Sequence, residues 1–136
     1  MNSRNKKITA LVVFLLVIII VALFVLNLGV SADISETKLK VSGFWYTREI
    51  SYSDIEAVNI YTGIEYGERV SGMSYISIYR GTYKNEEFGE YKCAVNKDVE
   101  SCIVVKLKSG EYYVFNSVDR ENTLKIYEFI KQRVNE

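Results

Sequence analysis

The chain has 136 residues, with seventeen basic and seventeen acidic side chains and neither histidine nor proline. Without histidine, Ser-His-Asp and Cys-His nucleophile systems are excluded, and two cysteines nine positions apart make a poor zinc site. No glycine-rich phosphate-binding motif occurs, and the pair Glu86–Glu87 lies in a charged segment typical of a solvated loop. The sequence therefore indicates no enzyme, no metal and no cofactor.

The N-terminal part is dominated by an apolar run, residues 8–30, which follows a basic stub, residues 1–7. A helix rises about 1.5 Å per residue, so this run is long enough to cross the roughly 30 Å hydrocarbon core of a bilayer. Because the run is apolar on every face, it predicts a transmembrane helix rather than a core helix. The side chains expected to represent the span are Ile8, Leu11, Phe14, Leu16, Ile20, Leu26 and Val30.

Two interpretations of this run remain open. The apolar part of a cleavable signal usually has about 7–15 residues, so the greater length here favours a permanent signal anchor. However, small residues from Val30 to Ala32 suit a signal peptidase. Cleavage after Ala32 would release a small, secreted, ligand-binding domain.

Flanking charge predicts the topology. Three basic residues precede the run, whereas only Lys38 and Lys40 follow it closely. This bias favours a cytoplasmic N-terminus and an extracytoplasmic C-terminal domain at the cell membrane. All seventeen acidic residues and fourteen basic ones follow the run, so the C-terminal part has a formal charge of −3, which argues against nucleic-acid binding.

Residues 31–37 are polar and are expected to form a linker, followed by one compact domain over residues 38–136. Eleven tyrosines, many in alternating contexts, favour about seven strands before residue 117. The last segment changes to a helical period of about 15 residues, with Ser117 or Asp119 as the N-cap. Its apolar stripe consists of Leu124, Ile126, Tyr127, Ile130 and Val134.

Residues 50–131 resemble the bacterial pleckstrin-homology (PH-like) domains of small membrane-anchored proteins. The resemblance rests on spaced structural segments rather than a catalytic signature: residues 53–55, 69–72, 79–83, 91–107 and 110–116, then a closing helix with Thr123, Leu124 and Tyr127. It implies an α+β, mostly β fold, in which a two-sheet, partly open barrel is capped by the C-terminal helix. It also implies a non-enzymatic role as a protein-binding or assembly module.

Some relatives of that fold bind phosphoinositides through a basic loop between the first two strands. Here the corresponding residues 38–48 contain three basic side chains but lack paired basic residues at the end of the pattern. Together with the charge of −3, this disfavours phosphoinositide binding, and Lys38 and Lys40 are expected to face solvent near lipid headgroups. The expected partners are the bilayer, through residues 8–30, and other membrane or envelope proteins or a second copy of the chain.

Cys93 and Cys102 lie in a predicted hairpin, residues 91–107. If residues 97–98 formed a two-residue turn, the cysteines would face each other with Cα atoms about 4.5 Å apart, near the lower limit for a disulfide. However, Lys97-Asp98 lacks the Asn-Gly chemistry of tight turns, and two small buried residues are an equally good interpretation.

Aromatic side chains provide the candidate interface residues. Trp45 lies between two other aromatic residues in a predicted strand, 44–50; core packing explains most such runs, but an outward ring near the bilayer would contact headgroups or a partner. Residues 74–80 alternate in polarity, which predicts one strand with Tyr75 and Tyr79 on the same face. The candidate interface therefore consists of Trp45, Tyr75 and Tyr79.

Overall fold

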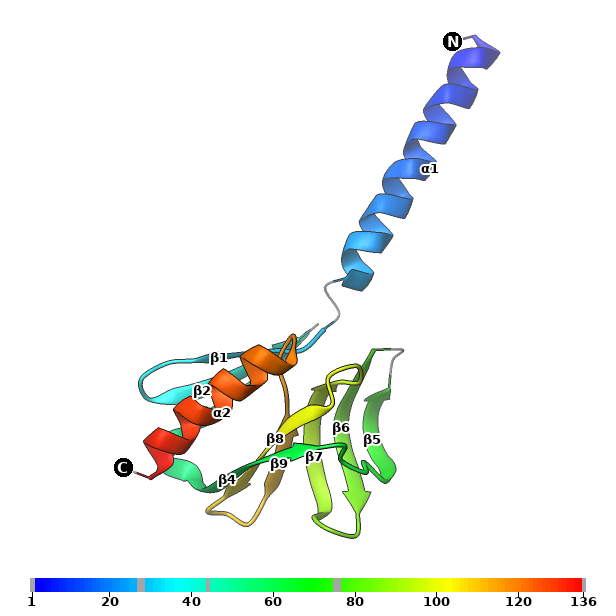
Figure 1. Ribbon diagram of the computed structural model, residues 1–136. Coiled ribbons are helices and arrows are strands. Elements are labelled where there is room, and N and C mark those ends of the chain that lie inside the picture. The colour runs from blue at the N-terminus through cyan, green and yellow to red at the C-terminus, as the bar shows by residue number, and fades with distance from the viewer. Residues whose placement is uncertain (1, 27–28, 44, 75–76, 136) are drawn as a thin grey trace.

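The computed structural model describes residues 2–26, 29–43, 45–74 and 77–135. Within them, a long N-terminal helix stands apart from a domain of two sheets and a C-terminal helix (Figure 1). The smaller sheet has the strand order β1-β2-β3, and the larger sheet has the order β4-β8-β9-β7-β6-β5. The elements are α1 (Ser3–Leu26), β1 (Ser31–Ile34), β2 (Lys38–Gly43), β3 (Tyr46–Ser51), the 3-10 turn η1 (Tyr52–Asp54), β4 (Ile55–Thr62), β5 (Glu68–Ser74), β6 (Ile78–Asn85), β7 (Gly89–Asn96), β8 (Ser101–Leu107), β9 (Tyr112–Phe115) and α2 (Arg120–Val134).

The predicted fold class is confirmed. An apolar N-terminal helix precedes two sheets of three and six strands that do not close into a barrel, and a helix ends the domain. The described residues form nine strands, where the sequence predicted about seven. The difference has two sources: a strand in the predicted linker, and a strand break inside residues 74–80.

Helix α1 is long and apolar enough to cross a membrane. The side chains of Ile8, Leu11, Phe14, Leu16 and Ile20 are exposed, because the helix does not pack against the described part of the domain. The helix ends at Leu26, so the prediction that Val30 belongs to the span is wrong. Val30 is instead 1% exposed in the core of the domain.

The linker prediction is also wrong for residues 31–34, which form strand β1. This strand pairs antiparallel with β2, and Ala32 faces Val41. Only one side chain of the strand, Ala32, is buried. An edge strand with a single small buried residue has almost no hydrophobic pattern, which is why its sequence resembled a linker.

The main core fills the space between the two sheets and α2. Its buried side chains come from both sheets and the helix, and include Leu39, Val41, Ile50, Ile103, Val105, Phe115, Ile126 and Ile130. Helix α2 packs against β4 and β8. Its predicted N-cap, Asp119, is confirmed, because the carboxylate accepts a hydrogen bond from the Asn122 N–H at 2.8 Å.

Polar and aromatic side chains join the smaller sheet to the larger one. The hydroxyl groups of Tyr46 on β3 and Tyr113 on β9 lie 2.7 Å apart. Arg48 stacks 4.5 Å from the centre of the Tyr113 ring and forms a 2.8 Å ion pair with Glu111. Burial raises the pKa of Tyr113, and the adjacent Tyr46 raises it further. The pair of phenols therefore stays protonated and holds β3 over β9.

The larger sheet does not contain the predicted β7–β8 hairpin. Strand β9 lies between them, parallel to β7 and antiparallel to β8. The connection after β7 therefore leads across the sheet, and β9 fills the gap from a later part of the chain (Figure 1). A parallel pairing of this kind joins segments with no short turn between them, so turn chemistry could not reveal it.

Strands β5 and β6 replace the single strand predicted over residues 74–80. Strand β5 ends at Ser74 and pairs with β6 in the register Ser74–Tyr79. Gly81 lies inside β6 opposite Gly72, and both have positive φ angles (133° and 98°). A side chain on either glycine would collide with the backbone of the facing strand. This facing pair of β5 and β6 therefore requires glycine at both positions.

Candidate functional site

The chain enters the domain at Val30, where the buried side chain of Asn96 holds it. The Val30 N–H donates to Oδ1 of Asn96, and Nδ2 of Asn96 donates to the Val30 carbonyl, both at 2.8 Å. The same Nδ2 also donates to the Ser117 carbonyl at 2.8 Å. One amide thus joins three distant segments: the residue before β1, the end of β7 and the connection between β9 and α2. We call this arrangement the Asn96 clamp.

A second buried amide, Asn116, supports the clamp. The Asn96 N–H donates to Oδ1 of Asn116 at 2.7 Å, and Nδ2 of Asn116 donates to the carbonyls of Asn96 and Val99, each at 3.1 Å. Asn116 is fully buried, and its polar atoms face the connection between β7 and β8. Because a buried amide without partners is costly, this network specifies the arrangement of these segments.

The clamp lies close to the end of α1. Only residues 27–29 separate Leu26 from Val30, and four Cα–Cα steps span at most about 15 Å. The apolar part of α1, from Ile8 to Leu26, is about 28 Å long at 1.5 Å per residue, close to the thickness of a bilayer core. The clamped edge of the domain is therefore tethered near the end of the apolar helix.

We call this edge the rim; it consists of the β2–β3 turn, the β7–β8 connection (97–100) and the β9–α2 connection (116–119). Figure 1 shows the start of β1, the β7–β8 connection and the start of α2 on the side of the domain from which α1 emerges. Gly43, at the end of β2, lies beside Gly29 and Val30. The β2–β3 turn therefore adjoins the point of chain entry.

Two large apolar side chains are exposed on the rim. Trp45 is 91% exposed and has a φ angle of 52°, while Val118 is 61% exposed. Trp45 was predicted within a strand, 44–50, but it lies in the β2–β3 turn and β3 begins at Tyr46. Phe44, its neighbour, lies outside the described residues.

A second exposed surface is strand β5, at one edge of the larger sheet. Every residue of β5 except Met73 is exposed, and Val70 is 53% exposed. Residues 70–74 carry no charge. The opposite edge strand, β4, is covered by α2. Beyond Glu68 and Arg69, β5 thus presents an uncharged stretch of sheet edge, a feature that natural sheets usually block with charges or a covering segment.

Comparison with protein families gives one match, to the family described as Bacterial PH domain, over residues 30–133. This region covers most of the chain and all nine strands of the described residues. The chain belongs to the bacterial PH domain family. The comparisons with curated proteins and with solved structures found no match.

The matched PH domain begins at Val30, the residue held by the Asn96 clamp. The clamp is therefore part of the domain itself rather than of a linker. Sequence reasoning missed Asn96 and Asn116, although each ends an apolar strand segment and could have been recognised there. A polar amide directly after buried residues such as Val95 or Phe115 signals a side chain that must find partners inside the fold.

The PH domain keeps Cys93 and Cys102 as buried, unbridged thiols. Cys93 faces Val114 on β9, and Val114 faces Val104 on β8, so the two cysteine-bearing strands are two strand spacings apart. At about 4.8 Å per spacing, their Cα atoms lie roughly 10 Å or more apart, beyond the reach of a disulfide. The predicted cross-strand pairing of the cysteines is thus wrong, because β9 separates their strands.

The two thiols belong to a second apolar cluster, on the other face of the larger sheet. It contains Tyr83, Tyr91, Cys93, Val95, Cys102, Val104 and Val114, and the loop before β5 covers it with Ile64 and Tyr66. The Tyr66 hydroxyl lies 3.1 Å from Sγ of Cys102. Burial, together with the smaller effect of the neighbouring Cys102, raises the pKa of Cys93 to about 12. Such thiols are poor nucleophiles at neutral pH.

The predicted interface tyrosines do not form an exposed pair. Tyr75 lies outside the described residues. Tyr79 is half-buried, with its ring centre 5.0 Å from that of Tyr66 and 5.5 Å from that of Tyr83. Of the three candidate interface residues, Trp45 is therefore the one that the described structure places on an open surface.

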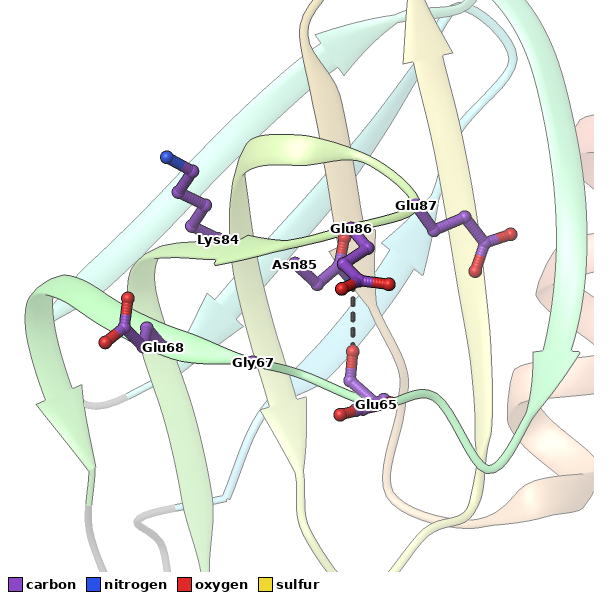
Figure 2. Close-up of a pocket in the computed structure, with 7 residues that line it drawn as sticks. All are labelled: Glu65, Gly67, Glu68, Lys84, Asn85, Glu86 and Glu87. Atoms are coloured by element: carbon purple, nitrogen blue, oxygen red, sulfur yellow. Dashed lines mark hydrogen bonds between the residues drawn. The ribbon is translucent and has the colours of Figure 1, made fainter.

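A surface cavity of about 640 Å³ in the described structure has an acidic lining. Glu65, Glu68, Glu86 and Glu87 contribute to it, and the Asn85 side chain donates to the Glu65 carbonyl at 2.9 Å. Figure 2 shows the side chains of Lys84 and Glu87 pointing away from each other. In the described part of the chain, no group of three or more acidic or cysteine side chains could hold a metal ion. The cavity lacks the converging polar groups of a catalytic site.

Proposed function

We propose that this PH-domain protein is a non-enzymatic, single-pass membrane protein that binds an extended segment of another membrane or envelope protein along strand β5. The observation that carries the proposal is the uncharged stretch of the β5 edge from Val70 to Ser74, in which every residue except Met73 is exposed. A peptide added to such an edge gains backbone hydrogen bonds, and neighbouring side chains supply specificity. The small residues Ser71, Gly72 and Ser74 allow a partner backbone to approach closely.

The anchored form is supported over the secreted form by the packing of residues 30–32. Cleavage after Ala32 would remove Val30 and Ala32 from the core and half of β1. It would also leave the Asn96 side chain without its Val30 partners. The family match, which begins at residue 30, includes the segment that cleavage would delete. An extracytoplasmic position of the domain follows from the flanking charges and remains part of the proposal.

Phosphoinositide recognition is not part of the proposed function. Lys38 forms a 3.0 Å ion pair with Glu49, and Arg48 pairs with Glu111. Neither basic residue lies in the β2–β3 turn. Their charges are used within the domain, so they do not form a headgroup site together.

Photo-crosslinking in intact cells tests the binding surface. A photoreactive amino acid at Val70 should give one discrete crosslinked species, identified by mass spectrometry as a membrane or envelope protein. The same group at Ser109, in the exposed β8–β9 turn, serves as the control. A product composed of two copies of this chain would replace the proposed partner by self-association. No product above the Ser109 level would overturn the proposed use of β5.

Two substitutions of Val70 form a matched pair that tests edge pairing. With the crosslinker placed at Ser71, Val70→Lys should abolish the product, since a charge on an edge strand opposes strand addition. Val70→Thr keeps a β-branched side chain and should retain the product. Equal yields from both variants would contradict edge pairing.

A further inference from the structure

We propose that the rim of the PH domain docks on the same membrane that α1 spans, with Trp45 and Val118 inserted into the lipid headgroup layer. The inference goes beyond partner binding at β5, and it depends only on α1 remaining in the chain and in the bilayer. It assigns a second membrane contact, on the domain itself. The contact would fix the orientation of the domain relative to the membrane.

The first support is the length of the tether. The Asn96 clamp holds Val30 in the domain, so the chain between bilayer and domain is limited to residues 27–29. This connection reaches at most about 15 Å. The headgroup region on each side of the hydrocarbon core occupies several ångströms of that distance. The tether therefore holds Val30, where the chain enters the rim, within about 15 Å of the end of α1.

The second support is the conformation of Trp45. A large aromatic residue with a φ of 52° is locally unfavourable, because only glycine, asparagine and aspartate adopt this region readily. The side chain is also 91% exposed, so burial within the domain does not compensate. Strain of this kind at an exposed position indicates a role outside folding. Tryptophan is enriched at membrane interfaces, where its ring lies among headgroups.

The third support is the position of Val118 near the chain entry point. Val118 follows Ser117, whose hydroxyl accepts a hydrogen bond from the Ala32 N–H at 3.4 Å and whose carbonyl is bound by Asn96. The β2–β3 turn reaches the same point through Gly43. Two of the large exposed apolar side chains of the described domain thus flank Val30. With α1, they would form three points of contact with one bilayer surface.

The charges of the rim favour an apolar contact over an electrostatic one. The acidic residues Asp98, Glu100 and Asp119 lie on its two connections together with the basic residue Lys97, and Arg120 follows as the first residue of α2. A surface of mixed sign gains little from anionic lipid. Docking should therefore occur on zwitterionic membranes and depend weakly on added anionic lipid.

The single tryptophan of the chain provides the test. The full chain is reconstituted into phosphatidylcholine vesicles that contain lipids brominated near the headgroup end of the acyl chains. Flotation at full-length mass first confirms that α1 is present and inserted, which separates a failure of anchoring from a failure of docking. We expect blue-shifted Trp45 emission, strong quenching by brominated lipid and weak quenching by aqueous iodide. Added phosphatidylglycerol should change these values little.

Two further variants use the same assay in a Trp45→Phe background. Val118→Trp should report lipid contact as Trp45 does, whereas Ser109→Trp, in the exposed β8–β9 turn, should be quenched only by iodide. Iodide quenching of Trp45 equal to that of the Ser109→Trp variant would overturn the proposal. Shielding from iodide without quenching by brominated lipid would also overturn it, because a second copy of the chain would then cover the ring.

Discussion

The side-chain amide of Asn96 satisfies both backbone hydrogen-bonding groups of Val30, sixty-six positions earlier in the chain. Val30 lies four residues beyond the end of α1. The amide therefore ties the membrane-directed segment to the end of β7. Because Asn96 is buried in the domain, packing of the domain itself keeps the connection to α1 short.

Asn96→Ala should destabilise the domain. It leaves the Val30 N–H and carbonyl and the Ser117 carbonyl without their buried partner. Since each unpaired buried group costs about 1–3 kcal/mol, we expect the free energy of unfolding to fall by about 3 kcal/mol. Urea unfolding of the detergent-solubilised chain, followed by near-ultraviolet circular dichroism of the tyrosines, measures the change. Asn59→Ala, at an exposed position of β4, is the control and should change the free energy of unfolding little. Equal effects of the two substitutions would contradict the role of the Asn96 clamp.

The chain should persist in the membrane without cleavage after Ala32. Cells that express a C-terminally tagged chain are treated with external protease, and intact mass is measured on untreated membranes. We expect a full-length chain, with an untagged mass of 15.6 kDa, whose tag is removed by protease. An N-terminus at Asp33 would show that the segment 30–32 is dispensable. A protected tag would place the domain in the cytoplasm.

Cys93 and Cys102 should behave as two buried thiols. Iodoacetamide at about pH 8 should leave the native chain unmodified, because burial raises the pKa of both thiols. The same reagent in denaturant should add two labels per chain. Mass spectrometry without reductant provides the measurement. A denatured chain that accepts no label until a reductant is added would reveal a disulfide and disprove the strand arrangement.

Stability should fall at alkaline pH. The pKa of Cys93 rises from 9.0 to about 12 on burial, and burial also raises the pKa values of Tyr66 and Tyr113. The unfolded chain therefore loses these protons first, so stability present below about pH 9 declines as pH rises toward 12. Urea midpoints measured at pH values from about 7 to 11 should show this decline. Replacing both cysteines by alanine should flatten it between about pH 9 and 10.

Trp45→Gly should stabilise the domain relative to Trp45→Ala. Both variants remove the indole ring, but only glycine adopts a φ of 52° without steric cost. We expect a difference of about 1 kcal/mol in the free energy of unfolding. The measurement is urea unfolding of both variants in the same detergent. If alanine were equal to or better than glycine, the turn would not impose the left-handed conformation that the membrane-docking argument uses.

Local patterns explain which parts of the fold were predicted. The apolar period of residues 120–134 and the capping carboxylate of Asp119 predicted α2, because helix signals lie within a few residues of one another. The same reasoning missed β1, which buries only Ala32. It also left open a pairing of Cys93 with Cys102, because a hairpin is the simplest connection between neighbouring strand segments. Tertiary pairing placed β9 between them.

The candidate surfaces also include one residue that the sequence indicated and others that only the structure revealed. Trp45 could be singled out as an exposed aromatic candidate, but its left-handed conformation and its position two residues after Gly43, which lies beside Val30, required the structure. Val70 and Val118 carry no local signal, since isolated valines are usually buried. Their exposure depends on which strand forms the sheet edge and where the chain enters the domain.

The sequence by itself determined the apolar helix, the mostly β domain, its closing helix and the lack of histidine-based chemistry. These features depend on composition and short-range periodicity, which any folded state of this chain must respect. The tertiary structure alone decided that Val30 belongs to the domain, that Asn96 and Asn116 hold it, and that β9 separates the cysteines. These outcomes arise from contacts between residues far apart in the chain, where burial and hydrogen-bond satisfaction override local preference.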